Sequence, residues 1–510
     1  MSTWIICLLF QAVVAGEVLK FPPGFKLGTS TASYQIEGGW NASVTSTGKG
    51  ENIWDRLTHS HPELIADRST GDVACDSYHL YEEDVRILKE LKVDHYRFSL
   101  SWSRLLPGGF SNNINPDGVV YYNNLINALI SNNITPMVTL YHWDLPQPLQ
   151  DLGGWTNPQT AIYFEDFARV AFELFGDRVK MWITINEPSS ICVGTYEADI
   201  AAPAYVRSPG IGLYLCGKTI LLAHARAYRL YDSVYRKKYG GKIGITIDTI
   251  WAEPKTNASE DVDAAERVMQ VGLGWWAHPI FSAEGDYPQI MKSRVEQNSK
   301  VENFSESRLP PFTPKEVKFV QGTADFFGLN HYRTLLISNH EFPSDSPPSL
   351  IKDLGVVGSI DPNWKPSPKI VPWGFRKVFN WIKNAYNNPL VIVTENGYGD
   401  GGGIQDNARV LFLKEYMKAL LLALLEDGCN INGYTVWSIM DNLEWRDGYT
   451  VKYGLYDVNF NSPNRTRTPK VSAIFYRDVI KTRTLPEKWN LDTITKTVKT
   501  LKLPKFNKQN

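Results

Sequence analysis

The sequence has few cysteines, almost no net charge and no long apolar run after its N-terminus. Five cysteines in 510 residues are too few for a disulfide framework, and no CxxC spacing suggests a metal site. The formal net charge of −1 gives no reason to expect nucleic acid or an anionic membrane as partner. No later apolar run reaches the roughly 20 residues that a membrane span needs, so we expect no membrane anchor.

The first 16 residues have the pattern of a secretory signal peptide. Residues 4–10 are apolar, and residues 12–16 end in small side chains suited to cleavage. The alternative is a short N-terminal helix packed on the domain. We expect secretion, for example into a gut lumen or a storage vesicle. Five N-x-S/T sequons agree with a glycosylated chain, at Asn41, Asn133, Asn257, Asn303 and Asn464.

Cleavage of the signal would remove Cys7 and leave four cysteines. These are Cys75, Cys192, Cys216 and Cys429. The sequence leaves open whether two of them form one bridge or all remain free buried thiols. Aromatic residues are abundant by contrast, with 16 Trp, 25 Tyr and 22 Phe. Most must belong to a large core, and several could line a sugar site, because the C–H faces of pyranoses stack on flat apolar rings.

Short β-rich runs alternate with longer helical stretches along the chain. The β runs cover residues 26–33, 95–102, 136–142, 181–187, 242–248, 325–332, 390–395 and 433–440. Helical stretches lie between them, for example at 78–91, 159–175 and 408–427. Eight such units predict an α/β protein with a single (β/α)₈ barrel over residues 17–490, long βα loops over the active-site face, and a C-terminal tail at 491–510.

Two of the aliphatic runs end in a glutamate. Glu187 ends the fourth run and precedes Pro188, and Glu395 ends the seventh and precedes Asn396. Burying either carboxylate unpaired would be costly, so both are expected at strand ends facing a polar pocket. Glycoside hydrolysis needs two such carboxyl groups in different protonation states. Taken singly, each glutamate could instead cap the helix that follows it.

The flanking residues make the pattern specific. Six motifs occur in order: FKLGTSTASYQIEG at 25–38, YRFSLSWSR at 96–104, YHWDLP at 141–146, TINEP at 184–188, VTENG at 393–397 and DNLEW at 441–445. With these motifs the chain resembles glycoside hydrolase family 1, the β-glucosidase family, and particularly its secreted animal and insect members. The resemblance spans roughly residues 20–485, and it implies the same (β/α)₈ barrel.

The resemblance implies a retaining mechanism carried by the two glutamates. Glu395 is expected to attack the anomeric carbon, while Glu187 protonates the leaving oxygen and then deprotonates water. Such pairs lie about 5–5.5 Å apart. Arg97 and Tyr332 match the residues that hold the nucleophile and keep it ionised.

The remaining matches concern the sugar. Asn186 matches the residue that binds the 2-hydroxyl group, and Trp437 the platform under the ring. Other hydroxyl binders are expected at Gln35, His142, Glu444 and Trp445. Members that act on phosphorylated sugars replace the Glu444 position by a small residue, so the resemblance implies a neutral sugar, most often glucose, with galactose or fucose left open. No metal or organic cofactor is expected.

The aglycone side departs from the family pattern. Ser367 stands where a tryptophan platform is usual, and Arg333 and Arg446 stand where small or apolar residues are common. The two arginines could bind an acidic or sulfated aglycone, or could simply face solvent or form salt bridges.

The primary hypothesis is a β-glycosidase acting on a small-molecule glycoside or oligosaccharide, as a monomer or homodimer. The main alternative is a thioglucosidase that cleaves glucosinolates. The aphid type of that enzyme carries a lysine six residues after the acid/base, where this chain has Val193, and the plant type replaces the acid/base by glutamine. A transglycosidase or an inactive binding relative are further alternatives, and the second would be expected to have lost one of the glutamates.

Overall fold

The computed structural model describes residues 19–40 and 48–487. The predicted signal peptide, the sequon at Asn41 and the predicted C-terminal tail lie outside the described residues.

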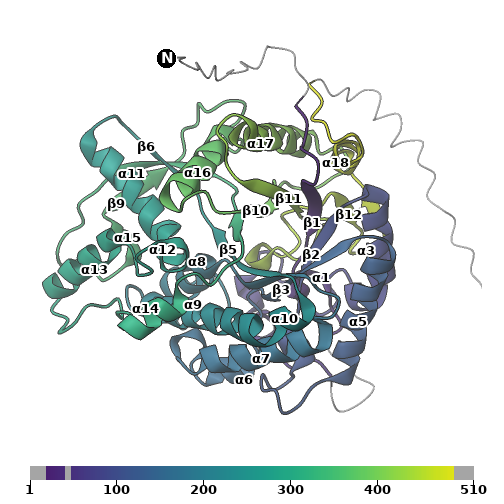
Figure 1. Cartoon of the computed structure of the whole chain (residues 1–510), viewed down its shortest axis with the longest axis horizontal. Coiled ribbons are helices and arrows are strands. Elements are labelled where there is room, and N and C mark those ends of the chain that lie inside the picture. The colour runs from purple at the N-terminus through teal and green to yellow at the C-terminus, as the bar shows by residue number, and fades with distance from the viewer. Residues whose placement is uncertain (1–18, 41–47, 488–510) are drawn as a thin grey trace, which may run out of the picture.

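Eight parallel strands close into a barrel in the order β1-β11-β10-β7-β5-β4-β3-β2 (Figure 1). Their bounds are β1 Lys26–Ser30, β2 His95–Ser99, β3 Thr135–Tyr141, β4 Met181–Asn186, β5 Lys242–Asp248, β7 Phe327–Asn330, β10 Val391–Asn396 and β11 Ile431–Trp437. β1 closes the barrel by pairing with β11, from Lys26 opposite Gly433 to Ser30 opposite Trp437. Each strand lies within two residues of the start of its predicted run, so the predicted (β/α)₈ barrel is confirmed.

The interior of the barrel is filled near the start of its strands. Met137, Ile183, Phe326 and Ile392 form a buried apolar cluster of their own there. Gly28 leaves room for the His95 ring, because a Cβ at this position would lie 2.4 Å from its Nε2 atom. Packed side chains thus occupy one end of the barrel, and the carboxyl ends of the strands are left for polar residues.

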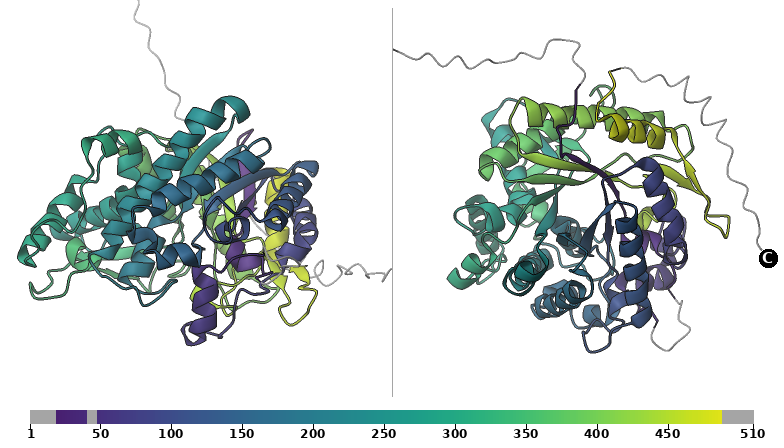
Figure 2. Two further views of the ribbon diagram at one scale, coloured as in Figure 1. Left: turned by 90° about the horizontal axis from the view of Figure 1, so that it is seen from below. Right: turned by 45° about the vertical axis from the view of Figure 1, so that its right-hand side comes forward.

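Helices cover the outside of the barrel (Figures 1 and 2). The longer ones are α3 Ser77–Leu91, α5 Pro116–Ser131, α7 Thr160–Phe175, α9 Gly212–Leu230, α11 Ser259–Gly272, α12 Gly274–Phe281, α13 Gln289–Val301, α16 Pro372–Ala385, α17 Asn407–Leu425 and α18 Val471–Thr482. α5 is an example of a helix start set by the local sequence. Pro116 occupies its first turn, and the Asn115 side chain caps it by accepting a hydrogen bond from the Asp117 N–H.

Short elements complete the fold. The helical ones are α1 Ser33–Ile36, α2 Ile53–Ser60, η1 Pro62–Leu64, α4 Trp102–Leu105, α6 Gln147–Asp151, η2 Gly154–Thr156, α8 Pro188–Cys192, η3 Val193–Glu197, η4 Tyr231–Tyr235, α10 Arg236–Tyr239, α14 Pro314–Val320, α15 Leu350–Leu354 and η5 Trp445–Asp447. The strands are β6 Trp251–Pro254, β8 Thr334–Asn339, β9 Val356–Ser359, β12 Tyr456–Val458 and β13 Arg467–Pro469. β6, β8 and β9 form a separate three-stranded sheet beside the barrel.

One disulfide bond links Cys192 at the end of α8 to Cys216 in α9. Cys75 and Cys429 are free and buried, so the structure decides the question that the sequence left open. Within residues 19–40 and 48–487, no helix is both long and apolar enough to cross a membrane. The described sequon residues Asn133, Asn257, Asn303 and Asn464 are exposed, as a glycan requires, and their glycosylation stays a prediction.

Candidate active site

Glu187 directly follows β4 and has a left-handed backbone conformation, with φ of 51°. Its N–H donates to the Thr246 carbonyl of β5, and its Oε1 accepts a hydrogen bond of 2.6 Å from Nδ2 of Asn330. Such a conformation is unfavourable for a side chain with a Cβ and persists only where its surroundings enforce it. The neighbouring strands β5 and β7 therefore hold the carboxyl group of Glu187 at the mouth of the barrel.

Glu395 lies in β10 and is held by a cation and a phenol. Nη1 of Arg97 donates to Oε1 at 2.5 Å, and the Tyr332 hydroxyl donates to Oε2 at 2.7 Å. All three groups are largely buried, so the ion pair is little screened by solvent. The pKa of Tyr332 is raised by burial and then by the charge of Glu395, which keeps the phenol protonated as a donor. The two hydrogen bonds fix the orientation of the Glu395 carboxyl group.

The pKa of Glu187 is shifted the other way, well above its usual value. Burial is the largest cause, followed by the negative charges of Asp248 and of Glu395. The two glutamates thus differ in environment: Glu395 has a direct cationic partner, and Glu187 has an amide donor and two carboxylate neighbours. At neutral pH this pair can present one protonated and one ionised carboxyl group.

Arg97 also orders the side chains expected to bind sugar. Its Nη2 donates to Oδ1 of Asn186 at 2.7 Å, so Nδ2 of Asn186 faces Nε2 of His142 at 3.0 Å. Burial, and then the charge of Arg97, hold the pKa of His142 well below its usual value, so the ring is neutral. Nε2 of His142 then accepts from Asn186, and the hydrogen is on Nδ1.

Among the described side chains expected to bind sugar, two buried polar atoms have no hydrogen-bond partner. They are Nδ1 of His142, a donor, and Oε1 of Gln35, an acceptor. Nε2 of Gln35 is occupied: it donates to Oδ1 of Asn442, to the Leu443 carbonyl and, at 3.3 Å, to Oε2 of Glu444. Buried polar groups are rarely left unpaired in folded proteins, so a free donor and a free acceptor here point to a polyhydroxylated ligand.

The carboxyl group of Glu444 is also perturbed. Burial, and then the charge of Glu395, raise its pKa to about 8. In the free site it therefore carries a proton near neutral pH and can both donate to and accept from a hydroxyl group.

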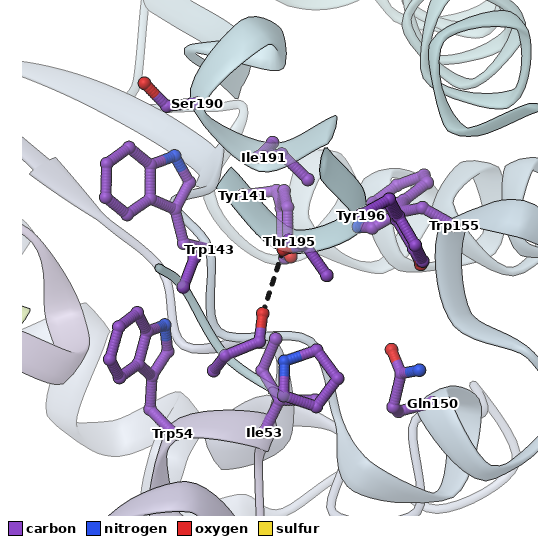
Figure 3. Close-up of a pocket in the computed structure, with 13 residues that line it drawn as sticks. Ile53, Trp54, Tyr141, Trp143, Gln150, Trp155, Ser190, Ile191, Thr195 and Tyr196 are labelled. Atoms are coloured by element: carbon purple, nitrogen blue, oxygen red, sulfur yellow. Dashed lines mark hydrogen bonds between the residues drawn. The ribbon is translucent and has the colours of Figure 1, made fainter. Parts of the chain in front are cut away.

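Aromatic rings wall the site. The imidazole of His142 stacks with Trp437 and with Trp445, at centroid distances of 5.7 and 6.1 Å. Trp445 also packs against Trp143 and Trp54, at 4.6 and 4.7 Å. Figure 3 shows Trp143 and Trp54 lying on one side of a small cavity of about 10 Å³ beside this wall. The rings are thus fixed by packing on one another.

A larger pocket of about 500 Å³ opens in front of Glu187 and Tyr332. Arg333 and Lys369 line it, and both are exposed; whether Arg333 contacts an aglycone stays a prediction. Ser367 and Arg446 are not among the lining residues of this pocket. Nε and Nη2 of Arg446 are buried with no hydrogen-bond partner among the described residues, so it is neither a simple solvent-facing residue nor a salt-bridged one.

The sequence reasoning missed two charged residues of this pocket, Asp248 and Lys369. Asp248 ends β5, and the same signal that singled out Glu187, an acid at the end of an aliphatic run, would have found it. Lys369 lies in an irregular segment before α16, where no periodic pattern indicated the direction of its side chain.

The comparisons with known proteins agree with this geometry. The family model of Glycosyl hydrolase family 1 matches residues 18–485. Myrosinase 1 of Brevicoryne brassicae is 51% identical over 469 residues, which are 91% of this chain and 99% of that protein.

Solved structures have the same fold. The aphid myrosinase structure superimposes with a TM-score of 0.86 at 50% identity, covering 91% of this chain and 99% of the other. A rice β-glucosidase mutant, solved in a covalent complex with Glc, reaches a TM-score of 0.83 at 37% identity and covers 90% of this chain and 98% of the other. The chain therefore belongs to glycosyl hydrolase family 1, a family of (β/α)₈-barrel glycosidases.

Proposed function

We propose that the protein is a retaining β-glycosidase that releases a terminal neutral sugar, foremost glucose, from a small-molecule or oligosaccharide glycoside. The observation that carries the proposal is the asymmetry of the two glutamates. Glu395 is hydrogen-bonded to Arg97 and Tyr332, while burial and nearby carboxylates raise the pKa of Glu187. One group is therefore suited to nucleophilic attack and the other to proton donation.

In the first step Glu395 attacks the anomeric carbon. The bond from that carbon to the leaving oxygen breaks, its electron pair goes to the oxygen, and the proton of Glu187 neutralises it. The products are a glycosyl ester of Glu395 and a free alcohol. The covalent complex with Glc described for the rice relative supports an ester of this kind.

In the second step water attacks the same carbon. Formation of the ester has removed the charge of Glu395, so the pKa of Glu187 falls and it can accept the proton of the water. The ester bond breaks, its electron pair returns to Glu395, and the sugar leaves with its original anomeric configuration. Transfer of the sugar to another alcohol would use the same intermediate.

The sugar is proposed to lie between Trp437 and the polar groups that lack a partner. Nδ1 of His142 and Oε1 of Gln35 are free to bind hydroxyl groups, and Glu444 lies beside Gln35. Burial and the charge of Glu395 already keep a proton on Glu444, and a 6-phosphate would add further negative charge to the same buried site, which disfavours a phosphorylated sugar.

Thioglucoside cleavage is the second candidate. Arg333 and Lys369 both line the pocket in front of Glu187, and two cations there suit a sulfated or otherwise anionic aglycone. The 51% identity to an aphid myrosinase supports this candidate. Val193 at the position of the aphid-type lysine weighs against an identical binding mode.

A substrate panel tests both candidates. The secreted protein would be assayed with aryl β-glucoside, β-galactoside and β-fucoside, with cellobiose and with a glucosinolate, and the anomer first released would be followed by NMR. We expect β-glucoside turnover with the β-anomer as first product. An α-anomer first product, or no turnover of any glycoside, would overturn the proposal. A glucosinolate turned over faster than the aryl glucoside would favour the second candidate.

Secretion is proposed on the predicted signal peptide alone. Expression of the full chain in insect cells, with N-terminal sequencing of the protein in the medium, tests whether cleavage occurs after residue 16.

A further inference from the structure

Asp248 is a third carboxyl group in the pocket of Glu187, and the mechanism above assigns it no role. It is the last residue of β5 and lines the same pocket as Glu187. Its Oδ2 accepts a hydrogen bond of 3.2 Å from the Ser190 hydroxyl. Its Oδ1 is buried and has no hydrogen-bond partner in the described part of the chain. A buried carboxylate oxygen without a partner is costly to maintain, which asks for an explanation.

Asp248 neighbours two residues that adjoin Glu187, one on the sheet and one along the chain. Along the sheet, Asp248 lies opposite Asn330, whose Nδ2 donates to Glu187. Along the chain, Ser190 belongs to α8, which begins at the residue after Glu187. β5 also accepts the Glu187 N–H through Thr246. The carboxyl group of Asp248 is thus built into the same support that orients Glu187.

We propose that Asp248 is a positioning residue that acts through Glu187, making ionisation of Glu187 less favourable while Glu395 is free and, to a smaller total extent, while Glu395 is esterified. This inference rests on the proposed glycosidase function. A carboxylate near a second carboxyl group makes ionisation of the latter unfavourable, because two like charges in a buried site repel each other.

The charged groups around Glu187 are consistent with an electrostatic effect of Asp248 on it. Glu395 is occupied by its own ion pair with Arg97, so part of its charge is offset. Asp248 accepts a hydrogen bond from the Ser190 hydroxyl and forms no ion pair in the described part of the chain. The other titratable side chains that line the pocket are Tyr332, Arg333, Lys369, Tyr398 and Tyr453. The pKa of Asp248 is raised to about 6, mainly by burial, so Asp248 is charged above roughly that pH. Above that pH the charge of Asp248 opposes ionisation of Glu187.

The two negative neighbours differ in what happens to them during the reaction. The charge of Glu395 disappears when the ester forms, whereas Asp248 keeps its charge throughout. Asp248 thus raises the pKa of Glu187 in both steps, which favours proton donation and delays its action as a base to higher pH.

The test compares Asp248→Asn with Asp248→Glu. The pH dependence of kcat/KM for an aryl β-glucoside would be measured for both variants and the wild type. We expect Asp248→Asn to move the alkaline limb to lower pH by roughly 1 unit, and Asp248→Glu to leave it near the wild-type position, because only the first removes the charge. An unmoved alkaline limb in Asp248→Asn, or an equal shift in Asp248→Glu, would overturn the inference. Asp248→Ser takes the place of Asp248→Asn if the latter does not fold.

A second measurement separates this inference from the proposed function. The titration of Glu187 would be followed by ¹³C NMR with labelled glutamate carboxyl groups, assigned by the signal lost in Glu187→Gln. We expect its midpoint to fall in Asp248→Asn whether or not a glycoside is turned over. An unchanged midpoint contradicts the role of Asp248 alone, while a wild-type protein inactive on every glycoside contradicts the glycosidase proposal alone.

Discussion

Arg97 contacts both the proposed nucleophile and an expected sugar-binding residue. Its Nη1 donates to Glu395 and its Nη2 donates to Asn186, while Nε donates to Thr139 inside the barrel. The planar guanidinium makes these bonds in a fixed fork, so one side chain sets the orientation of the nucleophile and of an expected sugar-binding amide. Lysine could not reproduce this geometry.

The first prediction concerns Glu395. We expect Glu395→Gln to lower kcat for an aryl β-glucoside on the order of 10⁴-fold or more, because the amide cannot form the glycosyl ester. Glu63→Gln, at an exposed position that lines neither of the two pockets described above, is the matched control and should retain wild-type activity. Substantial turnover by Glu395→Gln would mean that another group is the nucleophile.

The second prediction concerns Glu187. In Glu187→Ala the first step should survive with an activated leaving group such as dinitrophenolate, because departure of that group needs no proton. The second step should slow for want of a base. Azide should restore turnover and yield a β-glycosyl azide, which mass spectrometry detects. If azide neither accelerates the reaction nor appears in the product, the acid/base role is wrong.

At the scale of elements, α8 connects the site to the helical shell. It starts directly after Glu187 and ends at Cys192, whose disulfide bond reaches Cys216 in α9. The bridge therefore joins the segment that follows Glu187 to one of the longer outer helices.

The third prediction follows from this bridge. Replacing Cys192 and Cys216 together by alanine should lower the free energy of unfolding by about 3 kcal/mol, the size expected for a closed loop of this length. Urea denaturation of both proteins measures the difference. A reductant should lower the stability of the wild type and leave the double variant unchanged, since Cys75 and Cys429 are already free. Equal stability of the two oxidised proteins would contradict the prediction.

The strands could be predicted because each one is a short aliphatic run buried on the sheet. Some helices and short strands could not. The sequence alone predicts loops at 38–72, 285–314 and 341–369, but these segments contain α2, α13, and α15 with β9. In α15 the buried residues are Lys352 and Asp353, which pair with Glu302 and Arg308. The buried side of this helix is charged and is held by ion pairs with residues far away in the sequence. The sequence therefore has no apolar periodicity there that would predict a helix.

At the scale of the whole molecule, the two ends of the described chain lie side by side, just before the start of β1. Lys20 pairs with Thr484, and the Leu485 N–H donates to the Leu19 carbonyl. Arg483 donates to both oxygens of Asp94, at 2.6 and 2.7 Å, and Oδ2 of Asp94 also accepts the Leu27 N–H. These contacts tie the residue after α18 to the start of β1 and β2, where the barrel closes.

The fourth prediction concerns this ion pair. Arg483→Ala should lower the free energy of unfolding by about 1 kcal/mol, a modest value because the guanidinium is partly exposed and screened. Arg477→Ala, which breaks only a long surface contact to Asp478, is the control and should change stability by less than roughly 0.5 kcal/mol.

The difference in unfolding free energy between wild type and Arg483→Ala should depend on pH through the ionisation of Asp94. Burial opposes ionisation of Asp94, but the hydrogen bonds from Arg483 and Leu27 outweigh it, so the pKa of Asp94 is lowered. A lowered folded-state pKa contributes stability that is complete above the unfolded value of about 3.9 and is lost as the pH falls through the folded value. The gap between wild type and Arg483→Ala should therefore be constant above about pH 5 and shrink below about pH 4. A gap that is unchanged at low pH would contradict the role of Asp94.

The sequence by itself determined the barrel, the family and the residue types at the candidate site. A buried strand and the polar residue at its end can be recognised from a run of a few neighbouring residues. Glu187 and Glu395 both lie at the end of such runs. Only the tertiary structure decided how those residues are perturbed. The pKa of Glu187 depends on Asp248 and Glu395, from other strands, and the pairing of Cys192 with Cys216 depends on how α8 and α9 pack. Likewise Arg333 lines the pocket and Arg446 does not, because distances between side chains on different elements are set when the barrel closes.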